Sequence, residues 1–370
     1  MNTTARRSAG TISSYCEGRD NNLNLLRILA ASLVIVTHVF SITGNAGSEP
    51  FKTTFDISFG SWAVDIFFVV SGFLIAKSWD RNRSISKFIW ARVMRIYPAL
   101  WVCVLICVFI VGIGFTTLPV RAFLTHPDTL TFLAKNLTLL KGTFTSLPGT
   151  FSDHLVRDTN GSLWTLPYEI KMYIALLALG WMGWLYKKGV VPIIVLFSFA
   201  IHAWCDASGL TETRLTEYSR FIYFFFVGSY FYLQRERIPL RGEIAGALLG
   251  IVVACMFLSE IRYRTLSLSI ATPYLVMYCA YIPSGIIRAY NKVGDYSYGV
   301  YIYGAPAQQV VFAMGGSMMS FAENVAWSLS LAGGLAILSW HLLERRALRT
   351  ALPRIDWRRT RSIYDENRIK

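Results

Sequence analysis

Apolar segments of near-bilayer length dominate this sequence and leave few folds open to it. A transmembrane helix needs about 20 consecutive apolar residues. Only 16% of the residues are charged and the mean hydropathy is +0.43, whereas about a quarter of the residues in a soluble domain are charged. These values exclude a soluble enzyme, a disordered chain and a secreted disulfide scaffold. They predict an all-α polytopic integral membrane protein with about ten transmembrane helices, at 23–42, 58–79, 96–116, 163–185, 190–205, 219–233, 243–259, 266–283, 295–314 and 322–343.

The basic residues indicate how these helices are oriented in the membrane. The net charge is +14, and 24 of the 36 Lys and Arg residues fall in the segments on one side of the membrane, the side that also holds both termini. Cytoplasmic segments are enriched in Lys and Arg. We therefore expect both termini to be cytoplasmic, and we expect the basic C-terminal tail to face lipid headgroups and not nucleic acid.

The apolar pattern also predicts how the chain is divided. We expect an N-terminal tail (1–22), a transmembrane domain (23–343) with an outer loop at about 117–162, and a basic C-terminal tail (344–370). A short apolar piece of the outer loop, 132–140, predicts a re-entrant or interfacial segment. The cysteine spacing indicates neither a disulfide framework nor a zinc site. We interpret four histidines as structural or solvated, because none has a partner at metal-ligand spacing: His126, His154, His202 and His341.

Ionisable residues inside the apolar stretches indicate function, because a charge in a bilayer is costly. Arg27 and His38 are eleven residues apart, which places both on one helix face, about 16 Å apart along the axis. Asp65 and Glu169 lie at a depth similar to that of His38 on two other helices. A histidine beside a carboxylate can take a proton from a hydroxyl, so His38, Glu169 and Asp65 are candidate catalytic residues. The alternative is an arginine that reaches the headgroups and a satisfied core histidine.

A second basic group lies at the cytoplasmic side. Arg92 and Arg95 are three residues apart and share a helix face at the start of the third apolar stretch. With Arg27 they form a candidate phosphate-binding cluster, because the planar guanidinium group suits phosphate. The alternative is the ordinary enrichment of basic residues on the inner side. Phosphates held inside and a histidine farther out fit an acyl-CoA whose pantetheine arm runs along the bundle.

Four motifs in chain order resemble those of the membrane acyltransferase-3 family, from about Asn24 to Glu344. They are the Arg-x10-His pair of Arg27 and His38, VDIFFVVSGF at 64–73, RVMRIYP at 92–98, and GSLWTLPYE at 161–169 followed by Tyr173. Pieces at 136–140, 147–149, 297–301 and 308–309 are similar to the bacterial branch that O-acetylates exopolysaccharide and O-antigen. Two positions depart from the family pattern. Gly304 stands where many members have a histidine, and Glu344 is followed by two arginines instead of Lys-Pro, which we expect to affect only the helix end.

The resemblance implies a stand-alone O-acyltransferase of the bacterial cytoplasmic (inner) membrane. It implies transfer of an acyl group, most often acetyl, from acetyl-CoA as co-substrate to a sugar hydroxyl of a lipid-linked or exported glycan. No permanently bound cofactor, metal or nucleic acid is expected. The expected partners are acetyl-CoA, the glycan, membrane lipids and glycan-assembly proteins.

The resemblance also implies roles for the candidate residues. His38 acts as general base or as transient acyl carrier, oriented by Glu169 or Asp65, and the three arginines Arg27, Arg92 and Arg95 hold the CoA phosphates. Ser71 is a weaker candidate nucleophile, because a Ser-Gly pair in an apolar helix favours close helix packing. Three aromatic residues are predicted either to stack on a sugar or to belong to the interfacial aromatic belt: Trp164, Tyr168 and Tyr173.

Two functions of other classes stay open at this point. A transporter of a sugar or glycolipid also suits about ten helices with ionisable residues at one depth. Such transporters often contain inverted repeats with interrupted helices, and the Arg-x10-His pattern has no counterpart in the second half of the sequence. A non-catalytic member of a polysaccharide assembly complex would leave the buried charges unexplained.

Overall fold

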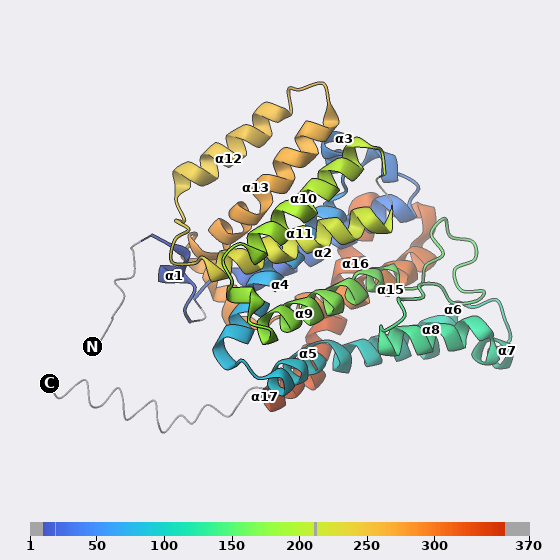
Figure 1. Cartoon of the computed structure of the whole chain (residues 1–370). Helices are drawn as coiled ribbons and strands as arrows, with labels where there is room; N and C mark the ends of the chain where they lie inside the picture. The colour runs from blue at the N-terminus through green and yellow to red at the C-terminus, as the bar shows by residue number, and fades with distance from the viewer. Residues whose placement is uncertain (1–9, 19, 211–212, 352–370) are drawn as a thin grey trace.

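Helices build the whole architecture of the described residues, 10–18, 20–210 and 213–351, in a computed structural model (Figure 1). Within these ranges the chain forms no β-strand. Residues 1–9 and 19 of the predicted N-terminal tail and residues 352–370 of the predicted C-terminal tail lie outside the described residues. α1 and α17, near the two ends of the described chain, lie toward the same end of the bundle, and α7 of the outer loop lies at the opposite end.

Each predicted apolar stretch coincides with a helix. The long helices are α2 (Leu23–Ile42), α4 (Phe59–Asn82), α5 (Ile85–Ile106), α9 (Leu166–Trp181), α10 (Val190–Ala207), α11 (Arg214–Leu233), α12 (Gly242–Cys255), α13 (Ile261–Tyr281), α15 (Ser297–Gly315) and α16 (Phe321–Ser339). The shorter helices are α1 (Ile12–Tyr15), α3 (Pro50–Phe55), α6 (Ile113–Phe115), α7 (Val120–Thr125), α8 (Pro127–Thr138), α14 (Tyr290–Val293) and α17 (Arg345–Ala351).

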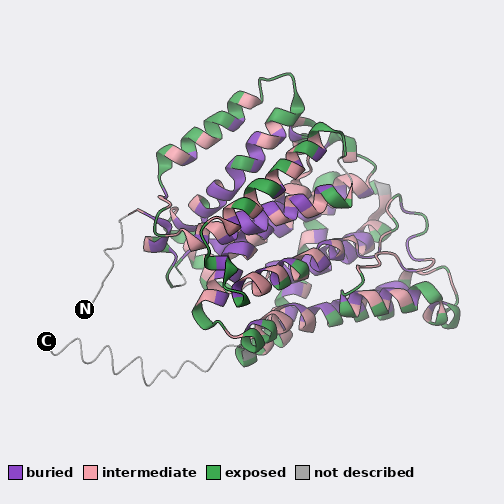
Figure 2. Cartoon of the chain, viewed as in Figure 1, coloured by how far each residue is buried: buried purple, intermediate pink, exposed green. Residues whose placement is uncertain are grey.

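The lengths and compositions of these helices suit a membrane protein. Among the described residues, five helices are long and apolar enough to cross a membrane, or six if α13 and the bent segment Ile286–Val293 form one span. Figure 2 shows much of α12 as exposed, and its exposed residues include Leu249, Ile251 and Val253, as lipid contact requires. The all-helical integral membrane fold is therefore confirmed, whereas the count of ten spans and the cytoplasmic termini stay predictions.

Small residues bring α4 and α11 into close contact at the centre of the bundle. A Cβ atom on Gly72 would lie 1.8 Å from the carbonyl oxygen of Phe225, and one on Gly228 would lie 2.1 Å from that of Val69. The Ser229 hydroxyl donates to the Gly72 carbonyl oxygen at 3.1 Å. Such contacts replace the hydrophobic effect as the source of helix association in lipid. The sequence analysis predicted a packing role for the pair Ser71–Gly72. In the structure, Gly72 is the residue of this pair that allows the close approach of α11.

The outer loop folds back against the bundle. The side chains of Tyr97 and Trp101 on α5 donate to the last carbonyl oxygens of α8 at 2.9 and 3.0 Å. Farther along the loop, the fully buried Asn160 donates to the carbonyl oxygen of Ile302 on α15 at 3.0 Å. As a result α9 begins at a buried position, with Leu166 only 2% exposed. The loop therefore helps to build the interior of the protein.

Candidate active site

The three arginines singled out from the sequence line one cavity of about 160 Å³ between α2, α4, α5, α9 and α15. Arg27 comes from the start of α2, and Arg92 and Arg95 come from α5. Leu348 of α17 adds to the wall, so this space, which we call the inner cavity, lies toward the end of the bundle that holds α1 and α17. The structure thus brings the side chains of all three arginines to one site.

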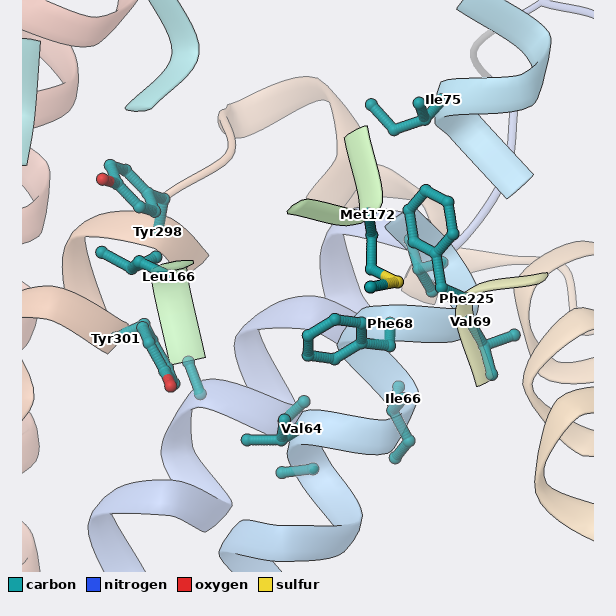
Figure 3. Packing of buried hydrophobic residues seen from close by; sticks show 14 of the residues in the cluster. Val64, Ile66, Phe68, Val69, Ile75, Leu166, Met172, Phe225, Tyr298 and Tyr301 are labelled. Carbon is teal, nitrogen blue, oxygen red and sulfur yellow. The ribbon is translucent and has the colours of Figure 1, made fainter. Parts of the chain in front are cut away.

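Apolar and aromatic side chains form much of the rest of the wall of the inner cavity. Figure 3 shows Tyr298 and Tyr301 of α15 with Leu166 of α9 on one side, and Val64 and Phe68 of α4 on the other. Cationic groups therefore stand beside an apolar surface. This combination suits a ligand that joins an anionic part to an apolar or neutral arm.

Two carboxylates that the sequence analysis missed neutralise part of the arginine charge. Asp295, in the loop before α15, pairs with Arg27 and with Arg95, the latter at 2.6 Å. Glu344, which is 1% exposed, lies 3.4 Å from Arg95. The two guanidinium groups stabilise the negative charge of Asp295 and compensate for the cost of burying it. The sequence does contain one feature that could have identified these two carboxylates. Both acidic residues lie at the ends of apolar stretches, next to segments that are otherwise basic.

Arg92 differs from the other two arginines because it forms no ion pair with any described residue. Its buried Nε–H has no hydrogen-bond partner there, and its guanidinium group lies 5.8 Å from the ring centroid of Tyr173. The Tyr173 hydroxyl donates to Glu169 and lies 3.1 Å from the hydroxyl of Ser71. A buried N–H without an acceptor is costly. Arg92 can therefore donate a hydrogen bond to an anionic or carbonyl oxygen of a ligand. That oxygen would lie beside the hydrogen-bonded chain of Ser71, Tyr173 and Glu169.

His38 lies outside the walls of the inner cavity. Its ring faces the side chain of Gln308 on α15, and the carboxylate of Asp158 in the outer loop lies within electrostatic range. The Gln308 amide nitrogen donates to the carbonyl oxygen of Ile35 at 2.8 Å, one turn before the histidine. Asp158 was not singled out from the sequence, because nothing in the sequence shows that the outer loop returns to the level of His38. Arg27 faces the segment at the start of α15, and His38 faces a residue toward the end of the same helix. Their shared face on α2 predicts that both side chains point toward one neighbouring helix.

Asp65 lies in a different part of the bundle from the other candidate residues. It is 2% exposed and accepts a hydrogen bond from Nε of Arg220 on α11 at 2.7 Å. Both line a second cavity of about 510 Å³ between α4, α10, α11 and α13, which we call the outer cavity. Trp164 borders the outer cavity, whereas Tyr168, on the adjoining helix, donates to Glu217 at 2.7 Å. The site residues are therefore distributed over the inner cavity, the outer cavity and the surroundings of His38.

Comparison with known proteins identifies one family match that covers most of the chain. The model of the acyltransferase-3 family, described as an acyltransferase domain, matches residues 20–344. The chain belongs to the acyltransferase-3 family. It is 29% identical over 364 residues to the O-acetyl transferase of Shigella phage Sf6, covering 91% of this chain and 98% of that protein. It is 26% identical over 370 residues to Nodulation protein 10 of Rhizobium leguminosarum bv. viciae, covering 93% and 98%. No solved structure matches the chain significantly.

The acyltransferase-3 match confirms the resemblance and the prediction of an O-acyltransferase, and favours this activity over transport. The matched region contains every candidate residue, together with the unpredicted Asp295 and Glu344. Gly304, where many acyltransferase-3 members have a histidine, lies against α2. A Cβ atom there would approach the side chain of Ile35 to 3.1 Å, so a larger side chain would require the side chain of Ile35 to shift.

Proposed function

We propose that this acyltransferase transfers an acetyl group from acetyl-CoA, bound at the inner cavity, to a hydroxyl group of a bacterial glycan. The observation that carries the proposal is the convergence of Arg27, Arg92 and Arg95 on one cavity that also has an apolar wall. The name of the phage Sf6 relative supports acetyl transfer to oxygen. The protein acts in the cytoplasmic (inner) membrane with both termini in the cytoplasm, where acetyl-CoA is made.

The donor binds by exchange of ionic partners. The CoA phosphates take over the guanidinium groups of Arg27 and Arg95 from Asp295 and Glu344, and Arg92 supplies its unused donor. The cavity is smaller than the roughly 300 Å³ at which ligand pockets begin. Entry of the donor therefore requires the wall to open, and Leu348 on the short helix α17 is one part of that wall.

His38 is the residue that we propose for the chemical step, as general base or as transient acyl carrier. It lies about 16 Å outward from Arg27 along α2, which suits the length of a pantetheine arm. Gln308 and Asp158 surround it and orient its ring. Glu169 acts at the donor end through Tyr173 and Arg92, and Asp65 holds α4 to α11 through Arg220. An acyl-histidine would give ping-pong kinetics, and direct transfer would need both substrates bound at once.

The direct test is acetyl transfer in isolated membranes. Membranes that contain the protein are mixed with ¹³C-acetyl-CoA and the surface polysaccharide of the same strain after mild alkaline removal of its O-acetyl groups. We expect ¹³C in O-acetyl groups of the polysaccharide, detected by NMR, for the native chain and for His126→Gln, a control at a half-buried histidine of the outer loop. Absence of label with the native chain, at an abundance that restores acetylation in cells, would refute acetyl-CoA as the donor.

A further inference from the structure

The outer cavity has the size and the lining of a ligand site. Its volume of about 510 Å³ falls within the roughly 300–1,000 Å³ typical of pockets for small molecules. Lys52 and Asp56, both exposed, stand at its mouth, and the Asp65–Arg220 ion pair lies at its inner end. The cavity therefore runs inward from the outer ends of α4, α10, α11 and α13. No residue of the proposed donor site borders it.

Two polar groups that face this cavity lack partners. His202 is 7% exposed, and its Nδ1 atom has no hydrogen-bond partner among the described residues. Asp206 lies one turn farther along α10, and its buried Oδ2 atom is likewise unpartnered in the described ranges. Buried polar atoms in folded proteins are normally satisfied, and exceptions call for an explanation. Their common position on one helix face of a cavity wall indicates that a bound molecule supplies the missing partners, and that His202 is more than a structural residue.

The lining identifies the chemical class of that molecule. Asp206 and Glu217 present carboxylate groups, while the guanidinium group of Arg220 is already bound to Asp65. An anionic ligand such as a sugar phosphate would be repelled. Within the described residues no group of three or more acidic, His or Cys side chains is arranged to hold a metal ion. Hydroxyl groups, which donate and accept, satisfy both unpartnered atoms, and the ring of Trp164 offers a surface for stacking.

A layer of aromatic rings separates this cavity from the inner one. Phe68, which lines the inner cavity, stacks on the fully buried Phe221 with centroids 4.4 Å apart. Phe221 in turn lies 5.7 Å from Trp164, which lines the outer cavity. The two cavities thus have no lining residue in common, although neighbouring residues such as Val64 and Asp65 line one each. Substitutions on α10 are consequently expected to leave donor binding unchanged.

We propose that the outer cavity binds one neutral sugar unit of the glycan acceptor, with His202 and Asp206 as its hydrogen-bonding groups and Trp164 as its stacking surface. This inference rests on the proposed acetyl transfer to a glycan. The site positions and selects the acceptor; the acetylated hydroxyl belongs to that sugar or to a neighbouring one that reaches His38. His202 and Asp206 are therefore positioning residues.

Kinetics on the full-length protein in nanodiscs test the proposal. The acceptor is the strain's own de-O-acetylated polysaccharide, and the variants are His202→Phe, Asp206→Leu and the control His126→Gln. We expect each of the first two to raise the KM for the polysaccharide up to about tenfold, the effect of one lost hydrogen bond at the upper end of the usual range. We expect kcat and the KM for acetyl-CoA to stay as in the native chain. A conservative His202→Gln variant should recover much of the acceptor affinity, because its amide still bonds to hydroxyls.

Other outcomes overturn the inference. An unchanged acceptor KM in both variants would show that the cavity does not bind the glycan, and a parallel change in kcat and in the KM for acetyl-CoA would indicate a structural role. Saturation-transfer NMR with methyl glycosides of glucose, galactose and N-acetylglucosamine, without acetyl-CoA, separates this inference from the proposed function. If the protein bound glycosides in a His202-dependent manner but did not turn over acetyl-CoA, only the proposed donor would be refuted. If it turned over acetyl-CoA but bound no glycoside, only the outer site would be refuted.

Discussion

Replacement of Arg92 by glutamine separates ligand binding from structural stability in the inner cavity. Arg92 forms no ion pair with any described residue and has a buried Nε–H without a partner, so the variant breaks no salt bridge and loses only the contact with Tyr173. We expect its free energy of unfolding to change by less than about 1 kcal/mol. A charge-assisted hydrogen bond to a phosphate or carbonyl oxygen contributes about 1.5–3 kcal/mol. Loss of that bond raises the Kd for CoA about 10- to 150-fold.

Arg95→Gln is the matched comparison on the same helix face. Arg95 is 14% exposed and is held by Asp295 at 2.6 Å and by Glu344 at 3.4 Å. Removal of one partner from a buried ion pair costs about 3–5 kcal/mol, because the remaining charges stay buried. We therefore expect Arg95→Gln to weaken CoA binding and also to lower the melting temperature by several degrees.

Isothermal titration calorimetry with CoA and thermal unfolding, both on detergent-purified protein, measure the two quantities. The exposed Arg262, paired only with Glu260 at 3.4 Å, provides a control variant, Arg262→Gln, that should behave as the native chain in both assays. If Arg92→Gln bound CoA with native affinity, the inner cavity would not be the phosphate site. If it instead melted as early as Arg95→Gln, the distinction between a free and a paired arginine would be wrong.

Three further predictions follow from the same contacts. His38→Ala at matched membrane abundance should abolish O-acetylation of the glycan while glycan export continues; intact acetylation with failed export would point to a transporter. Gly72→Leu should prevent folding, because its Cβ atom would lie 1.8 Å from a carbonyl oxygen of α11, whereas Gly246→Leu, with no atom within 4 Å, should give a normal monodisperse peak in size-exclusion chromatography. Asp295→Asn should tighten CoA binding in calorimetry while it lowers thermal stability; weaker binding would mean that this carboxylate positions the arginines and does not compete with phosphate.

Hydropathy and helical spacing predicted the parts of the structure that depend on one helix at a time. The apolar stretches correspond to helices, and three-residue spacing put Arg92 and Arg95 on one face of α5. The eleven-residue spacing likewise put Arg27 and His38 on one face of α2. These features follow from the geometry of a single helix. For the same reason they say nothing about which helices are neighbours.

The residues that the sequence analysis missed depend on lateral packing and on loop depth. Asp295 and Glu344 are far from Arg95 in sequence and meet it only because α15 and the end of α16 pack against α5. Asp158 reaches the level of His38 because Asn160 anchors the outer loop to α15. Equal depth on three helices suggested that Asp65 and Glu169 lie near His38, but depth fixes one coordinate only. Asp65 faces α11 and Arg220 instead.

The charges of the inner cavity determine how a donor can bind there. Asp295, Glu344 and Glu169 place three carboxylates against three guanidinium groups, and this balance allows arginines to remain in an apolar bundle, where an unpaired charge is costly. The same balance removes most of the attraction for an incoming phosphate. A phosphorylated substrate would therefore gain affinity in two ways. It would replace the carboxylates as partners of Arg27 and Arg95, and it would accept a hydrogen bond from the Nε–H of Arg92, which has no partner among the described residues. Under the proposed function, phosphate binding and release of the carboxylates of Asp295 and Glu344 are consequently one event.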